Sequence, residues 1–196
     1  RSSAASDVYK RQVSVFSDLN NLDDISMRQI YVDICGVTEQ ELHDNLESEL
    51  HELAEIRGVS YDDVCNELRA CYDGYHFTHN SIGIYNPFSL LNAFKYQEFS
   101  SYWFETGTPT YLVELLKKHH YDLHRMAHEE TTAEVLNSID STSDNPIPVI
   151  YQSGYLTIKG YDPEFGNYRL GFPNREVEQG LSLIHISEPT RLRRIS

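Results

Sequence analysis

The spacing of apolar residues changes once along this chain, and that change limits the folds it can adopt. As far as about Lys118, apolar residues recur at the three- and four-residue spacing of helices, in segments that begin at capping residues. From Tyr155 to Phe172 they alternate instead, which is typical of a half-buried β-hairpin. This order predicts an α+β fold, mostly helical, with a C-terminal hairpin.

Capping residues predict where the first two helices begin and end. Thr38 and Glu41 fit a capping box, and Gly58 ends that helix. Ser60 is the expected cap of the second helix, which stops at the turn signal Asp73-Gly74. The expected inner faces of these helices are Leu42, Leu46, Leu50 and Leu53, and Val64, Leu68, Cys71 and Tyr72.

Two Pro-containing pairs predict the next helices. Asn86-Pro87 opens a helix to about Lys95, and Thr108-Pro109 opens one that carries Leu112, Leu115 and Leu116. The inner face of the first of these is expected at Phe88, Leu91 and Phe94 or Lys95. Shorter helices are expected over Thr132–Ile139 and Pro146–Ser153, and the hairpin turn over Asp162–Gly166.

The charge balance argues against nucleic acid as a partner of this chain. It has 16 Lys and Arg residues against 30 Asp and Glu residues, a formal net charge of −14. Such a surface repels phosphate backbones, although most of its carboxylates are expected simply to keep the surface solvated. The aromatic content, with 14 Tyr and 8 Phe, is too high for a disordered acidic tail.

The cysteines and the apolar runs bear on the setting of the protein. Cys35, Cys65 and Cys71 form no framework pattern, which favours a reducing, cytoplasmic location. We expect Cys65 and Cys71 to pack as small apolar groups within one helix. No apolar run approaches the roughly 20 residues of a membrane span, so no membrane partner is expected.

Both ends of the chain differ in character from the segment between them. Residues 1–12 and 181–196 resemble conceptual translations of transposase-type sequencing-library adapters, in the strings SSAASDVYKRQ and LSLIHISEPTR. We therefore expect the natural segment to run from Val13 to Gly180, within a longer reading frame. The ends hold six of the basic and two of the acidic residues, so that segment has a formal charge of −18.

No motif of nucleotide hydrolysis or hydrolytic catalysis occurs in the sequence. It lacks G-x-x-x-x-G-K-[ST], G-x-G-x-x-G, H-E-x-x-H and G-x-S-x-G. ATP hydrolysis needs a phosphate cradle as well as carboxylates for Mg²⁺, so this chain is not expected to hydrolyse ATP unaided. No catalytic or metal-binding residue is assigned. The groups weighed and set aside are His120, His124 and His128, which cross an expected helix end, and the pairs Asp23-Asp24 and Glu129-Glu130.

Asp73, Tyr75 and His76 lie in the string YDGYHF, an aromatic and polar turn between helices. They could line a binding site. They could equally form a tight turn anchored in the core by Tyr75 and Phe77, which is the interpretation we favour.

Ser17, Asn20 and Asn21 follow a strand end expected at Val13–Phe16. Polar side chains in that place can sense a phosphate in an α/β nucleotide-binding sheet. They also suit ordinary turn capping, which we favour from the residues alone.

Several strings carry a family resemblance. The segment resembles the AAA-ATPase-like family of gut-type bacteria, whose members are often joined to a C-terminal PD-(D/E)XK-type nuclease domain. The matching strings are VSVFSDLNNLDDIS (13–26), CYDGYHF (71–77), IYNPFSLLNAF (84–94), YWFETGTPTYLVELLKK (102–118), IPVIYQSGYLTIKGYD (147–162) and YRLGFPNREVEQG (168–180).

The resemblance implies a position within a longer protein. Residues 13–37 would end the ATPase core, 38–118 would form a helical lid-like region, and 119–180 a winged-helix-like connector. The phosphate loop of the family would lie before Val13 and the nuclease after Gly180.

The resemblance also implies ligands and partners. It implies ATP and Mg for the intact parent and no cofactor in this fragment. Ser17, Asn20 and Asn21 are the residues that it places near the nucleotide. The partners would be the ATPase core and the downstream domain of the same chain.

We therefore expect a C-terminal, non-catalytic fragment that couples the nucleotide state of an absent ATP-binding core to a downstream domain. One alternative is a protein–protein interaction module without nucleotide dependence. Another is a nucleic-acid-binding winged helix. Its hairpin would offer Lys159 and Arg169 but also Asp162 and Glu164, and the net charge disfavours it.

Overall fold

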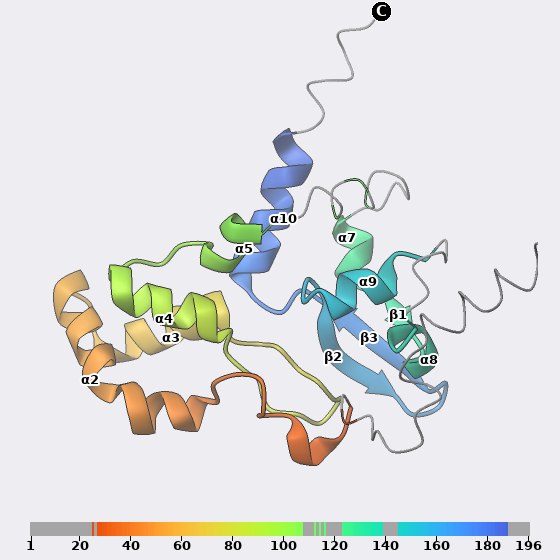
Figure 1. Cartoon of the computed structure of the whole chain (residues 1–196), viewed down its shortest axis with the longest axis horizontal. Coiled ribbons are helices and arrows are strands. Elements are labelled where there is room, and N and C mark those ends of the chain that lie inside the picture. The colour runs from red at the N-terminus through yellow and green to blue at the C-terminus, as the bar shows by residue number, and fades with distance from the viewer. Residues whose placement is uncertain are drawn as a thin grey trace, which may run out of the picture.

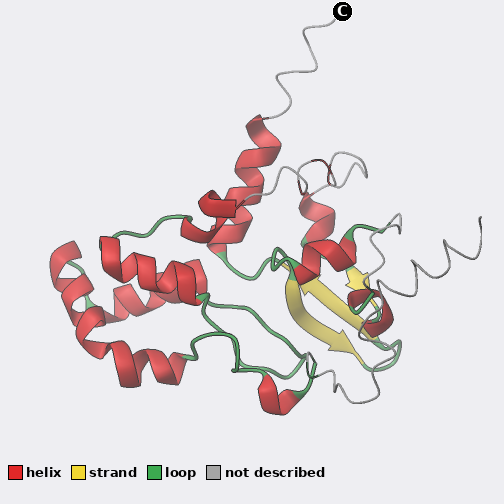
Figure 2. Cartoon of the chain, in the orientation of Figure 1, coloured by secondary structure: helices red, strands yellow, loops and turns green. Residues whose placement is uncertain are grey.

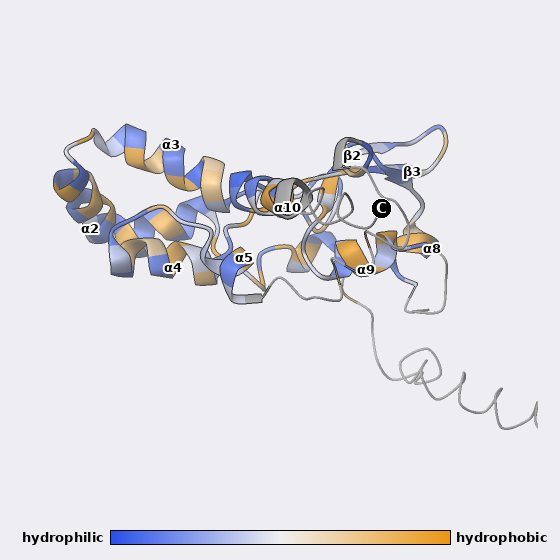
Figure 3. Ribbon diagram, turned by 90° about the horizontal axis from the view of Figure 1, so that it is seen from above, coloured by the Kyte–Doolittle hydropathy of each residue, from blue (hydrophilic) through white to orange (hydrophobic). Residues whose placement is uncertain are grey.

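The computed structural model describes residues 25, 27–107, 112, 114, 116, 123–138 and 145–187. Within them, helices α2, α3 and α4 form one end of an elongated molecule, and a small sheet with short helices forms the other (Figure 1 and Figure 3). Helices α5 and α10 lie between the two ends. Figure 2 shows that helices dominate, so the predicted α+β fold with a helical majority is confirmed.

Helix α2 (Glu39–Arg57) begins and ends where the sequence predicts. The Thr38 hydroxyl accepts a hydrogen bond from the Glu41 N–H, and the Glu41 carboxylate accepts one from the Thr38 N–H at 2.9 Å. These two bonds satisfy donors that a helix N-terminus otherwise leaves unpaired. Gly58 ends the helix in the left-handed conformation, with φ 66°.

Helix α3 (Tyr61–Tyr72) follows a second capping box, formed by Ser60 and Asp63. Its inner face is the predicted one. Cys65 and Cys71 are both buried in it as free thiols, so their apolar role is confirmed.

The first of two apolar cores lies among α2, α3 and α4. Its buried members are Leu42, Leu50, Leu53, Ala54, Val64, Cys65, Leu68, Cys71, Tyr72, Tyr85, Leu90 and Ala93. Leu46 departs from the predicted face because α2 is kinked there, with φ −126°, and its side chain is only partly buried. The alternation of polar and apolar residues along α3 is visible in Figure 3 and matches this one-sided burial.

Helix α4 (Pro87–Tyr96) begins at the predicted cap, where Asn86 Oδ1 accepts from the Phe88 and Ser89 N–H groups. Between α3 and α4 the chain forms a loop that is closed by a bridge between Tyr75 and Ile84. We call residues 73–86 the connecting loop.

The face predicted for α4 is wrong. Phe88 is 46% exposed and Leu91 is 54% exposed. The buried side consists of Ser89, Leu90 and Ala93. Ser89 faces inward because its hydroxyl donates to the buried carboxylate of Glu176. Hydrophobic spacing could not reveal this acceptor, since it comes from the far end of the chain.

The remaining helices with bounds in the described part of the chain are short, apart from the last. They are η1 (Gln29–Tyr31), α5 (Tyr102–Gly107), α7 (Leu123–Met126), α8 (Ala133–Leu136), α9 (Ile147–Gln152) and α10 (Arg175–Ser187). Helices α8 and α9 lie within the two segments predicted as short helices. The predicted start at Thr108-Pro109 lies outside the described residues. No helix in the described part of the chain is long and apolar enough to cross a membrane.

Three strands form an antiparallel sheet in the order β1-β3-β2. Strands β2 (Thr157–Asp162) and β3 (Asn167–Gly171) form the predicted hairpin. In its turn, Asp162 Oδ1 accepts from two backbone N–H groups, and Gly166 has φ 69°. Strand β1 (Glu130–Thr131) was not predicted, because two residues are too few to show alternation.

The second apolar core lies between the sheet and its helices. Its buried members are Phe104, Leu112, Met126, Leu136, Ile147, Ile150, Tyr155, Leu156, Ile158, Leu170, Val177 and Leu181. Helix α10 continues past Gly180 as far as Ser187, and Leu181 is 1% exposed. Gly180 lets α5 approach closely, because a Cβ there would lie 2.3 Å from the Phe104 ring.

Candidate functional site

The residues placed near a nucleotide, Ser17, Asn20 and Asn21, lie outside the described residues, as does His120. Within the described part of the chain, no group of three His, Cys, Asp or Glu side chains is arranged to hold a metal ion. Among the described residues, polar contacts that join distant segments of the chain lie at the boundary between the two apolar cores.

The connecting loop lies along strand β2, and we call this contact the seam. The His76 N–H donates to Thr157 Oγ1 at 2.6 Å, and the Thr157 hydroxyl donates to the His76 carbonyl at 3.0 Å. Farther along, the His79 ring packs on Tyr161 with centroids 4.7 Å apart. The YDGYHF string therefore binds the helical end of the molecule to the hairpin.

The seam is tightest at Gly74. Its φ of 104° disfavours any L side chain, and a Cβ there would lie 2.2 Å from the Pro173 carbonyl oxygen. That carbonyl also accepts from Lys159 Nζ at 3.1 Å. Although Lys159 as a residue is exposed, its amine is turned into the seam. Burial lowers the pKa of this amine, and the Asp73 carboxylate offsets part of that effect.

The anchor that we favoured for the YDGYHF turn is found only in part, because the Tyr75 hydroxyl is buried but neither aromatic residue belongs to an apolar core. Tyr75 and Phe77 are only half-buried as residues. The turn is held by its backbone contacts to β2 and by the close approach of Gly74. Asp73, Tyr75 and His76 thus form part of an internal contact surface.

A second link across the molecule is made by Glu176, which is 3% exposed. Its carboxylate accepts from the Ser89 hydroxyl at 2.8 and 3.0 Å and from the Trp103 N–H at 2.7 Å. The Phe104 N–H is a weaker donor at 3.5 Å. One side chain near the start of α10 therefore holds the first turns of α4 and α5, and we call these bonds the Glu176 latch.

The latch is a buried carboxylate without a cationic partner among the described residues. Burial raises the pKa of Glu176 above its ordinary value, and the donors from Ser89, Trp103 and Phe104 offset only part of that rise. The N-terminal turns of three helices meet at this carboxylate, and their partial positive charges favour a negative group there.

Tyr75 occupies the space beside the latch. Burial raises the pKa of its hydroxyl, and the nearby amides of Asn86 and Asn174 partly oppose the rise. Asn86 caps α4, and Asn174 Oδ1 accepts from the Val177 N–H at 3.2 Å in the first turn of α10. The N-termini of α4 and α10 therefore approach each other around one tyrosine.

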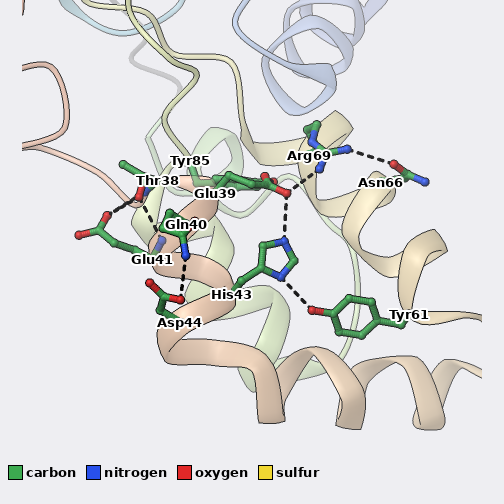
Figure 4. A network of polar contacts seen from close by, with 10 residues as sticks. All are labelled: Thr38, Glu39, Gln40, Glu41, His43, Asp44, Tyr61, Asn66, Arg69 and Tyr85. Atoms are coloured by element: carbon green, nitrogen blue, oxygen red, sulfur yellow. Dashed lines mark hydrogen bonds and ion pairs between the residues drawn. The ribbon is translucent and has the colours of Figure 1, made fainter.

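A separate polar network joins α2, α3 and the end of the connecting loop (Figure 4). Glu39 accepts from Tyr85 Oη at 2.5 Å, from Arg69 Nη2 at 2.5 Å, and is 3.3 Å from His43 Nε2. The other ring nitrogen of His43 is 2.8 Å from Tyr61 Oη. We call these contacts the Glu39 network.

Glu39 differs from Glu176 in its electrostatics. Burial alone would raise the pKa of Glu39, but hydrogen bonds from Tyr85 and Arg69, with the Arg69 charge, hold it below the ordinary value. The side chain is also 37% exposed. Both carboxylate oxygens of Glu39 already have hydrogen-bond partners that join the helices. The network is therefore a structural contact, and Glu39 is not arranged to act as a nucleophile or a general base.

Sequence reasoning missed the residues that form the latch. Ser89 was hidden because it lies within an apolar helix, and Glu176 because it resembles any exposed glutamate. A usable signal was present in Asn174, which stands directly before a segment with two early glutamates, Glu176 and Glu178. Such a pattern predicts a helix N-terminus, but it does not identify the residues that bind the Glu176 carboxylate.

Comparisons with known proteins add one relative. A protein of Azotobacter chroococcum mcd 1, described as "Uncharacterized protein in vnfD 5'region", is 38% identical over 190 residues. The alignment covers 93% of this chain and 34% of the relative. The chain therefore spans about a third of the length of this relative. No family model matches the chain, and no solved structure matches it.

Proposed function

We propose that this chain is a non-catalytic coupling segment of a longer AAA-ATPase-like protein. Its role is to transmit the nucleotide state of an ATP-binding core to a downstream domain, a nuclease in the arrangement that the family resemblance suggests. ATP and Mg belong to that core. The longer relative supports the idea that sequences of this kind occur within larger polypeptides.

The observation that carries the proposal is the Glu176 latch. The Glu176 carboxylate lies on α10 and accepts hydrogen bonds from Ser89 in α4 and from Trp103 in α5. A shift of α10 therefore displaces the acceptor of both helices at the same time. The seam adds a second connection, from the connecting loop to β2. A segment that transmits a conformational state needs such direct contacts between elements that can adopt two arrangements.

We further propose that residues 119–180 form a winged-helix-like connector. The order α7, β1, α8, α9, β2, β3 supports this, because a winged helix places a strand after its first helix and a hairpin after its third. The sheet order β1-β3-β2 agrees with that topology. Its role here would be to join domains rather than to bind nucleic acid, given the net charge of −14.

Hydrogen exchange in the longer polypeptide tests the coupling. We expect the backbone amides of Trp103 and Phe104 to change their protection between the ATP-bound and ADP-bound protein, because the latch loosens in one state. The Leu50 and Leu53 amides in the middle of α2 serve as the internal control. Unchanged protection at Trp103 and Phe104, in protein shown to bind both nucleotides, would refute the coupling role.

The alternative is a protein–protein interaction module without nucleotide dependence. Phe88 and Leu91 favour it, since both are large apolar side chains exposed on one face of α4. Replacing Leu91 with Glu would abolish partner binding if this face is the interface. The coupling role predicts instead that Leu91→Glu leaves the nucleotide-dependent exchange at Trp103 unchanged.

A further inference from the structure

The segment before α2 exposes large apolar side chains next to the connecting loop. Ile30 is 74% exposed and Ile34 is 64% exposed, and both lie within residues 28–36. Ile82, on the connecting loop, is exposed as well. We call Ile30, Ile34 and Ile82 the isoleucine patch. A single exposed apolar residue is ordinary on a protein surface, whereas several in adjoining segments indicate a contact surface.

Hydrogen bonds hold this segment against the connecting loop. The Gln29 amide donates to the Asn80 carbonyl at 3.3 Å and accepts from the Thr78 hydroxyl at 2.8 Å. Farther along, Val37 and Tyr85 exchange backbone hydrogen bonds at 2.8 and 3.4 Å. In Figure 1, η1 is the orange-red turn beside the loop. The two isoleucines of the segment therefore lie on a backbone that is fixed on both sides of them.

The contacts of the segment are the reverse of those expected for a solvent-facing turn. Its polar Gln29 is bonded to the protein, while Ile30 and Ile34 are left in water, where exposed apolar surface is unfavourable. Arg28 and Asp33 are exposed on the same segment. The patch thus combines apolar side chains with charged neighbours of both signs, which is the composition of a protein interface with a polar rim.

We propose that the isoleucine patch is the surface on which the preceding ATP-binding core packs in the longer polypeptide. The inference rests on the proposed function for the identity of that partner. The alignment covers 34% of the relative, so about two thirds of the length of the relative lies outside it. A core joined to the chain just before residue 25 is only a few residues from the patch, and so short a connection gives it a high effective concentration there.

Packing at this surface places the core in direct contact with the route to the hairpin. Ile30 contacts the core, and the adjacent Gln29 is bonded to Thr78 on the connecting loop. The same loop is bonded to β2 through His76 and Thr157 at the seam. A displacement of the core at the patch can therefore reach the hairpin through a continuous series of hydrogen-bonded segments.

Site-specific photo-cross-linking in the longer polypeptide tests the proposal. Ile30 is replaced with the photoreactive residue p-benzoylphenylalanine, and the linked peptides are identified by mass spectrometry. We expect links to peptides of the ATP-binding core of the same molecule. Links only to a second molecule, only to residues 25–187, or to nothing would overturn the proposal. If the replacement at Ile30 prevents folding, the same probe at Ile34 decides.

Ile56 is the matched control position. It is an exposed isoleucine near the far end of α2, about 25 Å along the helix from Glu39. The probe at Ile56 should link to the core about tenfold less than the probe at Ile30, because only the patch is in contact with the core. Equal yields would show that the contact is not specific to the patch.

A second pair of variants tests the apolar character of the contact. Ile34→Glu should lower the yield of links from position 30 by about an order of magnitude, because it buries a carboxylate without a partner. Ile34→Val should leave the yield nearly unchanged. If the two variants behaved alike, the patch would not be an apolar interface.

The exchange of the Trp103 amide separates this inference from the coupling function. Links to the core with no response of Trp103 to the nucleotide would support the docking surface and refute the coupling. A nucleotide response at Trp103 without links from Ile30 or Ile34 would support the coupling and refute the docking surface.

Discussion

Glu39 and Glu176 each hold helices together, but they are stabilised in different ways. Glu39 joins elements that are close in the chain or packed in one core, and it has the Arg69 cation as a partner. Glu176 joins α10 to helices more than 70 residues earlier, and its donors are a hydroxyl and backbone N–H groups. A partly exposed ion pair contributes little because solvent screens it. A buried carboxylate contributes much more to cohesion, since its removal leaves several donors unpaired.

The largest expected effect follows from that difference. Glu176→Ala should lower the free energy of unfolding by about 3 kcal/mol, because Ser89 and Trp103 lose an acceptor in a buried site. Glu39→Ala should cost about 1 kcal/mol, since water can reach the groups that it leaves behind. Urea titrations of both variants measure the difference. Equal costs would show that the latch is no more important than the Glu39 network.

Substitutions at two glycines test how much the close approach of the backbone at the seam contributes to stability. Gly74→Ala should cost about 2 kcal/mol or more, because it combines a positive φ with a collision at the Pro173 carbonyl. Gly58→Ala shares the positive φ but meets nothing within 4 Å, so about 1 kcal/mol is expected. Thermal unfolding of the two variants measures this. If they lose the same stability, the close approach at the seam is not a constraint on the fold.

The contrast also explains how far sequence reasoning could reach. Local patterns predicted the caps at Thr38, Ser60 and Asn86, and alternation predicted the hairpin, because each depends on neighbours within a few residues. The face of α4 was predicted wrongly because Ser89 is turned inward by Glu176, 87 residues away. The seam escaped notice for a related reason. Asp73 and Tyr75 acquire their environment from β2 and from the turn before α10, and no spacing in YDGYHF encodes that.

A smaller effect is expected at the helix caps. Thr38→Ala should lower the free energy of unfolding by about 1 kcal/mol, because the Glu41 N–H loses its acceptor at the start of α2. Thr38→Ser keeps the hydroxyl and should cost only a fraction of that. Far-ultraviolet circular dichroism during denaturation follows both variants. A larger loss than for Gly74→Ala would mean that local capping matters more to this fold than the seam does.

The smallest effect is a difference in pH dependence between the two glutamates. The folded-state pKa of Glu39 lies below its ordinary value of 4.5, so its contribution is present above that pH and is lost as pH falls through the lowered pKa. The folded-state pKa of Glu176 lies above 4.5, so its titration favours the folded state below that pH and ceases to do so as pH rises through the raised pKa.

Glutamine variants separate these two signs. Relative to Glu39→Gln, the wild type should lose stability as pH falls below about 4.5, to an extent that solvent screening reduces. Relative to Glu176→Gln, the wild type should gain stability as pH falls through the raised pKa of Glu176 toward its ordinary value of about 4.5. Unfolding free energies over this range measure both differences. If the Glu176 difference instead decreased with falling pH, its donors would outweigh burial, and the latch would be electrostatically equivalent to the Glu39 network.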